Sequence, residues 1–511
     1  METELPVRKQ KNLKLNIIFN AIYQIFVLIV PFITSPYVSR VLLPQGVGSY
    51  SLALSWVTYF STVAAFGFLD YGTTILAMHR NDKEKSSELF WQLLAAKFIF
   101  TLFICTIYVS LVMFDVFSSE AYPLNTKLVF ILLGSNILVN AFDASYLFQG
   151  FENFGQLCLR NFIVRLLNMI LIFVLVRSSD DYIAYIAIMG GSNLLLGLFS
   201  FIGIHRMVLF KRPKRLNLLT HITKALIYFI PMASVTFFPI ISKTFIGLFV
   251  QDASQSGYYE QADKLITLIV TMVNSVDAIM MSRMSYLYAI GDQEQIKEKT
   301  KKTLLFYMLL AIPAFFGLLI INPYFTIGFF GDEYQPSVDL VYILCFKVLL
   351  APLTALLGAI YYVPSGKIWR RNIFYIIGLA FNALMNFLLI FFFKTTGAAI
   401  ASVSTELLLV LLFVIFAYKD VPIFSLTKRS LPKIIDGALI MLIVCYFITT
   451  LIASRLTPIF VSVVTIIIGG VIYGLFLLLS REEIVFEYFR FYKEKLASIL
   501  HKIKGKLTRH K

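Results

Sequence analysis

The chain alternates long apolar runs with short charged connections, and this alternation constrains its fold more than any other feature. A helix needs about 20 mostly apolar residues to cross a bilayer. Only 14% of the 511 residues are charged and 59% are hydrophobic, which is more apolar surface than a soluble core could bury. The sequence therefore predicts an all-α polytopic membrane protein. Its fourteen transmembrane helices are expected at residues 15–41, 49–78, 91–114, 126–148, 161–177, 183–205, 225–250, 258–288, 303–328, 338–363, 372–393, 397–418, 435–454 and 458–480.

The basic residues predict the orientation. If the connections alternate between the two sides, 35 of the 45 lysines and arginines lie on the side of the N-terminus. The opposite side receives five, which are Arg40, Lys127, Arg177, Lys394 and Arg455. Basic residues favour the cytoplasmic side, so both termini are expected in the cytoplasm. The net charge of +16 is then explained by attraction to anionic membrane lipid, and not by nucleic-acid binding.

Two halves of the chain resemble each other. The loop "GVGSYSLALS" after the first run aligns with "QSGYYEQADK" after the seventh, with Gly48 over Gly257 and Tyr50 over Tyr259. Six helices in each half preserve the orientation, so we expect a parallel pseudo-two-fold repeat of two six-helix lobes, with the substrate between them. Chance similarity is the alternative, because proline and glycine are common in membrane helices. The expected organisation is an N-terminal cytoplasmic segment (1–14), an N-lobe (15–210), a basic inter-lobe loop (211–224), a C-lobe (225–418), two further helices (435–480) and a basic amphipathic cytoplasmic tail (481–511).

Paired prolines mark the first helix of each half. Each proline removes a backbone hydrogen bond and bends its helix, so these positions are candidate hinges for opening one side of the membrane at a time. The residues are Pro31, Pro36, Pro231 and Pro239.

Five cations lie inside the predicted spans. An ionised side chain at the bilayer centre costs at least about 2.5 to 3.5 kcal/mol, so most should face a hydrated interior or an acidic partner. Several converging cations suit an anionic, phosphate-bearing substrate. Alternatives stay open, since side chains near helix ends can snorkel to water and Lys264 follows Glu260 by four residues, the spacing of an ion pair. The candidate cationic cavity comprises Lys347, Lys243, Lys264, Arg165 and Lys97, together with Arg40.

Four acids are also embedded. A carboxyl group in such a position can exchange a proton or bind sodium, although structural pairing with an embedded cation explains each of them equally well. The candidates for ion coupling are Glu406, Asp70, Asp143 and Asp277.

The sequence contains no signature of catalysis. The four cysteines and five histidines form no metal-ligand spacing, and no GxxxxGK[ST] phosphate loop occurs, so no metal, cofactor or ATP hydrolysis is expected. The outer connections have about ten residues or fewer, which leaves little room for the catalytic loop of a polysaccharide polymerase or glycosyltransferase.

A family resemblance covers about residues 12 to 420. The segments "NAIYQIFVLIVPFITSPYVSRVLLPQGVGSYS", "FDASYLFQGFENFG", "LRNFIVRLLNMILIF", "QSGYYEQADKLI", "FFGDEYQPS" and "YYVPSGK" resemble, in this order, Wzx-type lipid-linked oligosaccharide flippases. These form the polysaccharide transporter family of the multidrug/oligosaccharidyl-lipid/polysaccharide exporter superfamily. Two positions depart from the family pattern. Thr74 stands where arginine is expected, and Ser242 replaces an acid beside Lys243, which would leave that lysine less neutralised.

The resemblance implies a function that is not enzymatic. The expected substrate is an undecaprenyl-diphosphate oligosaccharide, moved to the outer leaflet of a bacterial cytoplasmic membrane for capsule, exopolysaccharide or O-antigen synthesis. Alternating access driven by H⁺ or Na⁺ is implied, with membrane lipids, a polysaccharide polymerase and chain-length regulators as further partners. A multidrug exporter of the same superfamily is the nearest alternative, and a membrane polymerase or glycosyltransferase is an alternative of a different class.

Overall fold

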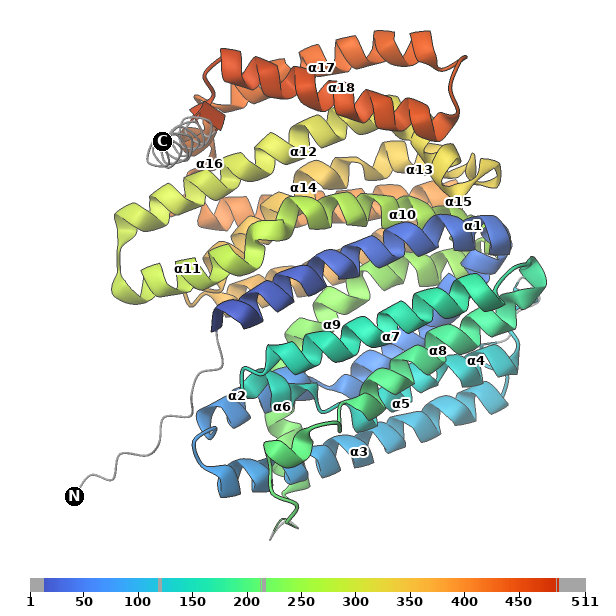
Figure 1. Cartoon of the computed structure of the whole chain (residues 1–511), viewed down its shortest axis with the longest axis vertical. Coiled ribbons are helices and arrows are strands. Elements are labelled where there is room, and N and C mark those ends of the chain that lie inside the picture. The colour runs from blue at the N-terminus through green and yellow to red at the C-terminus, as the bar shows by residue number, and fades with distance from the viewer. Residues whose placement is uncertain (1–12, 118–121, 212, 214–216, 484, 487–511) are drawn as a thin grey trace, which may run out of the picture. The chain divides into compact units, whose positions relative to one another are not determined.

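The structure is a computed structural model that describes residues 13–117, 122–211, 213, 217–483 and 485–486, and within these ranges it contains helices and no strand (Figure 1). The elements are α1 (Leu13–Ala65), α2 (Phe68–Met78), α3 (Lys83–Met113), α4 (Lys127–Leu133), α5 (Ser135–Phe142), α6 (Ser145–Gly150), α7 (Phe154–Leu175), η1 (Ser179–Asp181), α8 (Tyr182–Phe199), η2 (Ile204–Arg206), α9 (Leu218–Phe249), α10 (Ala253–Val273), η3 (Asn274–Val276), α11 (Asp277–Ile290), α12 (Gln293–Phe330), η4 (Asp332–Tyr334), α13 (Ser337–Leu344), α14 (Phe346–Ala355), η5 (Leu356–Tyr362), α15 (Ile368–Ala417), α16 (Ile423–Thr427), α17 (Leu431–Ile452) and α18 (Pro458–Leu479).

Many of these helices are long and apolar enough to cross a membrane. Among the described residues there are ten such helices, or eleven if α13 and the helical segment 346–362, which meet at a 42° bend, count as one span. The structure is thus the all-α polytopic membrane protein that the sequence predicts. The predicted N-terminal segment lies mostly, and the tail almost entirely, outside the described residues.

Two of the long helices contain a backbone break. Leu43 in α1 has φ 60° and ψ 173°, and Lys394 in α15 has φ 50° and ψ −131°. Leu43 directly precedes Pro44, and a proline disfavours helical geometry in the residue before it. Each break separates two runs that the sequence predicts as different spans.

The chain divides into two compact units. The first contains Met1–Glu260 and Ile390–Thr395, and the second contains the remaining residues. In the first unit α1 packs against α5, α7 and α9, α3 packs against α5, and α7 lies beside α8 (Figure 1). Because α9 packs on α1, α2 and α3, the division falls after Glu260, beyond the predicted inter-lobe loop. The lobe boundaries given above remain a prediction.

The second unit is organised around α12. This helix packs against α14, α17 and α18, and α17 and α18 form an adjacent pair (Figure 1). Tyr473 of α18 donates a hydrogen bond to the Leu309 carbonyl of α12 at 3.0 Å. The buried side chains between these helices include Ile434, Met441 and Leu477. The two additional C-terminal helices therefore pack on the second unit.

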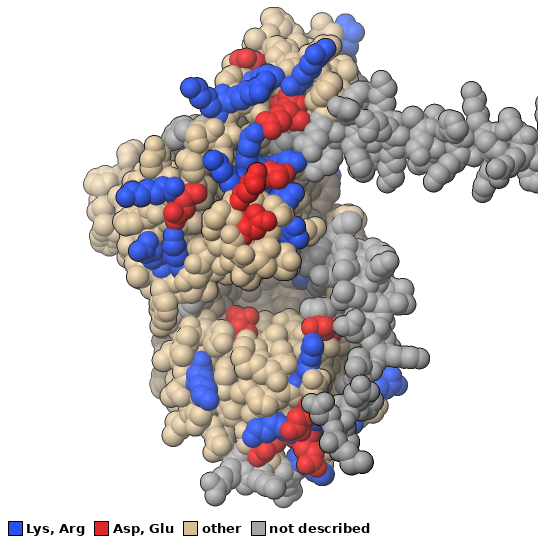
Figure 2. All heavy atoms as spheres, turned by 90° about the vertical axis from the view of Figure 1, so that its left-hand side faces the viewer, with Lys and Arg blue, Asp and Glu red and all other residues tan. Residues whose placement is uncertain are grey.

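Charged side chains gather at helix ends in each unit (Figure 2). In the first unit Arg80 pairs with Glu152 at 2.9 Å and Lys211 with Glu84 at 3.1 Å, so three predicted cytoplasmic connections meet at one end. In the second unit Lys301 binds Glu483 at 2.8 Å. These ends carry the basic loops from which the orientation is predicted.

Candidate translocation site

Lys243 has an acidic partner on the next helix. Its Nζ lies 2.6 Å from an Oε of Glu260 on α10, and Ser51 of α1 donates a hydrogen bond to the same carboxylate at 2.6 Å. The side chains of Lys243 and Glu260 are 20% and 18% exposed, so the pair is largely withdrawn from solvent. The expectation that Lys243 is less neutralised, because Ser242 replaces an acid, is therefore wrong. Glu260 of α10 supplies the negative charge that the family pattern places at position 242, next to Lys243.

Lys347 has an acidic partner as well. Its Nζ donates a hydrogen bond to Asp263 of α10 at 2.9 Å, and the two side chains are 12% and 9% exposed. Glu406 of α15 is buried, lies beside the Thr354 side chain of α14 and interacts electrostatically with Lys347. One lysine and two carboxyl groups thus form a cluster within the second unit, defined here as the Lys347 cluster (Lys347, Asp263, Glu406). It carries one more ionisable acid than base.

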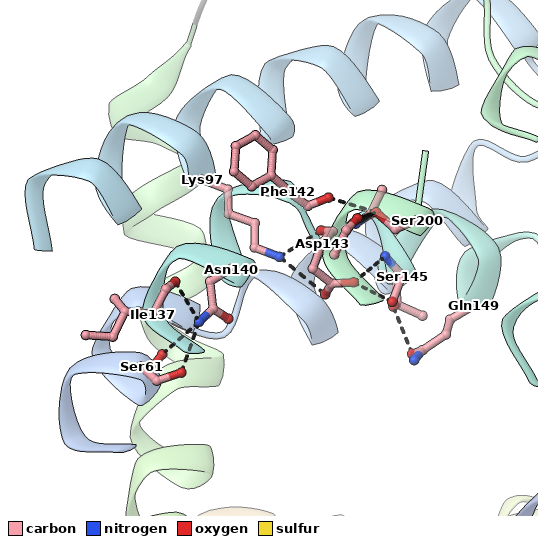
Figure 3. Close-up of polar contacts among 12 residues, drawn as sticks. Ser61, Lys97, Ile137, Asn140, Phe142, Asp143, Ser145, Gln149 and Ser200 are labelled. Atoms are coloured by element: carbon pink, nitrogen blue, oxygen red, sulfur yellow. Dashed lines mark hydrogen bonds and ion pairs between the residues drawn. The ribbon is translucent and has the colours of Figure 1, made fainter. Parts of the chain in front are cut away.

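Lys97 stabilises a break between two helices (Figure 3). Its Nζ donates to the Asp143 carbonyl at 2.8 Å and lies 3.5 Å from the Asp143 carboxylate. That carboxylate accepts from the Ser145 amide at 3.0 Å, at the start of α6. The cation therefore lies at the carbonyl end of α5 and the anion at the amide end of α6, which matches the dipoles of both helices. Lys97 is 2% exposed, so it does not snorkel to water.

Ser200 completes the same break (Figure 3). Its hydroxyl accepts from the Ala144 amide at 2.9 Å and donates to the Phe142 carbonyl at 2.8 Å. Non-helical backbone at membrane depth is tolerated where the protein satisfies its polar groups. Lys97 and Asp143 have a structural role here, whatever else they contribute.

Arg165 differs from the three paired lysines. It lies half-buried on α7, and its Nε is buried without a hydrogen-bond partner among the described residues. Lys264 is half-buried on α10, and Arg40 is exposed on α1. Both of these make interactions within the protein. Among the predicted intramembrane cations, Arg165 is thus the one whose buried N–H donor has no hydrogen-bond partner in the described part of the chain.

The remaining predicted acids have different surroundings. Asp70 is exposed on α2, and Asp277 at the start of α11 accepts a hydrogen bond from Tyr307 of α12. Tyr375 of α15 interacts electrostatically with both Asp277 and Glu406, so these acids belong to one region of the second unit. A coupling role for any of the four acids stays a prediction.

The four proline positions lie inside helices. Helix α1 continues through Pro31 and Pro36, and α9 continues through residues 231 and 239. The backbone break of α1 lies instead at Leu43. The hinge role of these prolines stays a prediction.

The sequence analysis considered Glu260 only as a partner of Lys264, and it did not identify Asp263 or Arg371 as site residues. Glu260 and Asp263 are three residues apart on one face of α10, and their spacing was an available signal for an acidic face. Arg371, which precedes the predicted span 372–393, is half-buried on α15, and its Nε has no hydrogen-bond partner among the described residues. Ser200 carries no signal in the sequence, because its role depends on the position of the α5–α6 break.

No group of three or more histidine, cysteine, aspartate or glutamate side chains in the described part of the chain could hold a metal ion. The arrangement consists of charge pairs inside a helical membrane protein, and it is suited to binding ions and charged groups. Fold and site together define a polytopic membrane protein with paired charges in its interior.

Comparisons with known proteins identify the family. The family model for polysaccharide biosynthesis proteins matches residues 13–279, more than half of the chain, and this protein belongs to that family. A putative O-antigen transporter of Shigella dysenteriae is 22% identical over 385 residues, which cover 75% of this chain and 94% of that protein.

Two solved structures share the fold. The lipid II flippase MurJ in an inward closed conformation superposes with a TM-score of 0.75 at 15% identity, covering 92% of this chain and 100% of MurJ. An inward-facing multidrug resistance transporter of the MATE family of the MOP superfamily gives a TM-score of 0.57 at 15% identity, covering 79% of this chain and 99% of that one.

Proposed function

We propose that this protein is a flippase that moves undecaprenyl-diphosphate-linked oligosaccharide units from the inner to the outer leaflet of the cytoplasmic membrane of a bacterium. The observation that carries the proposal is the match to a putative O-antigen transporter over 94% of that relative's length, within the polysaccharide biosynthesis family. The likeness to MurJ supports a fold that can accommodate a lipid-linked passenger. The products would serve capsule, exopolysaccharide or O-antigen synthesis, with a polymerase and chain-length regulators acting on them afterwards.

We propose fourteen membrane spans with both termini in the cytoplasm. The two helices that break at Leu43 and Lys394 each cover two predicted spans, which adds two to the ten long helices. The bent pair of 337–362 and the shorter apolar segment 127–142 supply the other two. The short segment is α4 and α5, and Gly134 separates them.

We further propose that the two halves are related by a pseudo-two-fold axis, with the domain organisation predicted from the sequence. A methyl group added at Gly48 would lie 1.7 Å from the Ala253 carbonyl oxygen, and one added at Gly257 would lie 2.1 Å from the Pro44 oxygen. Under the predicted alignment Gly48 corresponds to Gly257 and Pro44 to Ala253. Contacts that repeat with the two partners exchanged are what a two-fold axis produces. Ser51 and Glu260, which also correspond, contact each other.

Arg165 is the first candidate to bind the diphosphate. A guanidinium matches phosphate oxygens with two parallel hydrogen bonds, and this one has an unsatisfied buried donor. Lys243, Lys264, Lys97, Lys347 and Arg40 are proposed to contribute positive potential, since an ion pair still presents a local field. Their partners lower that contribution relative to an unpaired cation.

The Lys347 cluster is the proposed site of ion coupling. If all three groups are ionised the cluster carries a net negative charge, which one bound proton or sodium ion would neutralise. Glu406 is the proposed acceptor, because Asp263 already accepts a hydrogen bond from Lys347. Charge neutralisation in a low-dielectric interior gives an ion gradient a means of shifting the conformational equilibrium.

A multidrug exporter remains the second candidate, favoured by the likeness to a MATE transporter. The two functions differ in the charge of their passenger. An exporter of cationic drugs needs several acidic groups that are not already paired, whereas here Glu260, Asp263 and Asp143 each bind a lysine, and the surplus acid Glu406 is assigned to ion coupling.

Reconstitution tests the proposal directly. The purified protein is placed in liposomes that contain a fluorescent undecaprenyl-diphosphate oligosaccharide, and a membrane-impermeant quencher reports the fraction in the outer leaflet. We expect a proton or sodium gradient to accelerate the loss of inner-leaflet fluorescence, and a cationic drug not to compete. Fluorescence that is equally protected with and without the protein would reject the flippase assignment.

A further inference from the structure

The second unit contains a basic pocket outside the candidate translocation site. The pocket has a volume of about 530 Å³ and is lined by Lys301 of α12, by Ser425 and Leu426 of α16, and by Lys428 and Arg429 between α16 and α17. Three of its five lining residues are cations and none is an acid. An anion is the ligand that such a pocket attracts.

The cations differ in how far they are neutralised. Lys301 binds both carboxylate oxygens of Glu483 at 2.8 Å, so part of its charge is already balanced. Lys428 and Arg429 are exposed, and neither belongs to an ion pair with another described residue. The net positive charge of the pocket therefore comes mainly from these two adjacent side chains, one of which is an arginine that can form paired hydrogen bonds to a phosphate.

The position of the pocket, at the ends of two predicted membrane spans, indicates that its ligand comes from the membrane. Arg429 lies two residues before α17 begins at Leu431, and Lys301 lies at the edge of the predicted span 303–328. The pocket is thus located where two membrane spans end. From there α17 continues with exposed apolar side chains, including Leu439, Ile440 and Ile443. A ligand with a phosphate head and acyl chains would satisfy both the cations and this apolar surface.

We propose that this pocket binds the headgroup of an anionic phospholipid, with the phosphodiester between Lys428 and Arg429 and the acyl chains along α17. Basic pockets next to membrane-spanning helices are suited to such headgroups. The proposal requires the protein to be in a membrane and is independent of what the protein transports. It also assigns a role to the connection between the predicted C-lobe and the last two helices, α17 and α18.

Lipid binding by the full-length protein tests this site. Detergent-solubilised protein is titrated with phosphatidylglycerol or with zwitterionic phosphatidylcholine, and bound lipid is counted by native mass spectrometry. The pocket variant is Lys428→Gln with Arg429→Gln. Its matched control, Lys297→Gln with Lys419→Gln, removes the same charge from exposed positions of the same unit outside the pocket.

We expect the pocket variant to bind phosphatidylglycerol about tenfold more weakly, whereas the control variant should bind it as the wild type does. Phosphatidylcholine binding should not change in either variant. Equal loss in the two variants would show non-specific attraction by net charge and would overturn the proposal. A third titration with inorganic phosphate separates the two possible sources of the anion, since displacement of phosphatidylglycerol by millimolar phosphate would make free phosphate the ligand and overturn the assignment to lipid.

Discussion

Gly48 and Gly257 lie face to face, with the Gly257 amide nitrogen 2.7 Å from where a methyl group at Gly48 would lie. The sequence aligns the same two residues as equivalents in its two halves. The absence of a side chain at both positions lets α1 and α10 approach to backbone contact. Gly48 contacts the carbonyl of Ala253, and Gly257 contacts the carbonyl of Pro44. The predicted alignment also pairs Pro44 with Ala253, so the two contacts correspond to each other.

A methyl group at either glycine should therefore destabilise the protein. Gly48→Ala and Gly257→Ala each require a backbone shift, because the added atom would overlap a carbonyl oxygen, and overpacking of this kind costs about 1 to 3 kcal/mol. The measurement is the thermal unfolding midpoint of the purified protein in detergent. Gly191→Ala on α8 is the control, since no atom lies within 4 Å of the added methyl group there. An unfolding midpoint at Gly48→Ala equal to that of the control would contradict the observed contact.

The Lys243–Glu260 pair predicts a difference between single and double variants. Lys243→Met leaves the Glu260 carboxylate without its cation, and Glu260→Gln leaves the ammonium without its anion. Each should lower the free energy of unfolding by about 1 to 3 kcal/mol, because a charge that is largely shielded from water loses its partner. The double variant should regain most of that loss, since the remaining side chains carry no charge. Membrane abundance and unfolding midpoint of the three variants measure the coupling.

Flipping by the same three variants separates two roles for Lys243. If the lysine only balances Glu260, the double variant should recover flipping together with abundance. If Lys243 also binds the diphosphate, the double variant should be abundant but slow. We expect the second outcome, on the proposed function given above.

Arg165 should matter for flipping and not for folding. Its guanidinium has a buried donor without a partner, so Arg165→Ala removes no hydrogen bond within the described protein. A charge-assisted hydrogen bond to phosphate contributes about 1.5 to 3 kcal/mol, which corresponds to a loss of about 10- to 100-fold in flipping rate. Arg177→Ala, just beyond the end of the same helix, is the control and should flip at the wild-type rate. A collapse in abundance of Arg165→Ala would assign the residue a structural role instead.

His221 predicts a pH dependence of stability. It is buried on α9 before the predicted membrane span 225–250, with Nδ1 3.0 Å from the Tyr71 hydroxyl and Nε2 3.0 Å from the Gln92 amide oxygen. Burial lowers the pKa of His221 below its usual value, and the nearby Lys224 ammonium lowers it further. The folded protein therefore favours the neutral imidazole, in which Tyr71 can donate to one nitrogen while the other donates to Gln92.

The sign of the effect follows from this lowered pKa. Above the ordinary histidine pKa of about 6.5 both folded and unfolded chains hold the neutral ring, so the contribution to stability is complete. As the pH falls through that value the unfolded chain takes up a proton more readily than the folded one, and stability is lost. We expect the unfolding midpoint to fall between pH 7 and 5.5, and His221→Gln to reduce this slope. An unchanged slope in His221→Gln would assign the acid sensitivity to other groups.

The sequence by itself determined that this protein is helical and lies in a membrane. Apolar runs of membrane-spanning length are a local property, so the all-α membrane fold and most of its long apolar helices could be predicted from the sequence, whereas the breaks within helices, such as those that separate α4, α5 and α6, could not. The alignment of Gly48 with Gly257 could also be predicted from the sequence, and the two residues do lie in contact.

Only the tertiary structure decided the partners of the embedded charges. Lys347 and Asp263 are 84 residues apart in the chain, and Lys97 and Asp143 are 46 apart. Hydropathy and helical spacing describe what lies within one helix, whereas an ion pair between helices depends on which faces pack together. For the same reason the sequence could not distinguish Arg165 from the three lysines that are neutralised: the free energy of a buried charge depends on atoms that approach it through space.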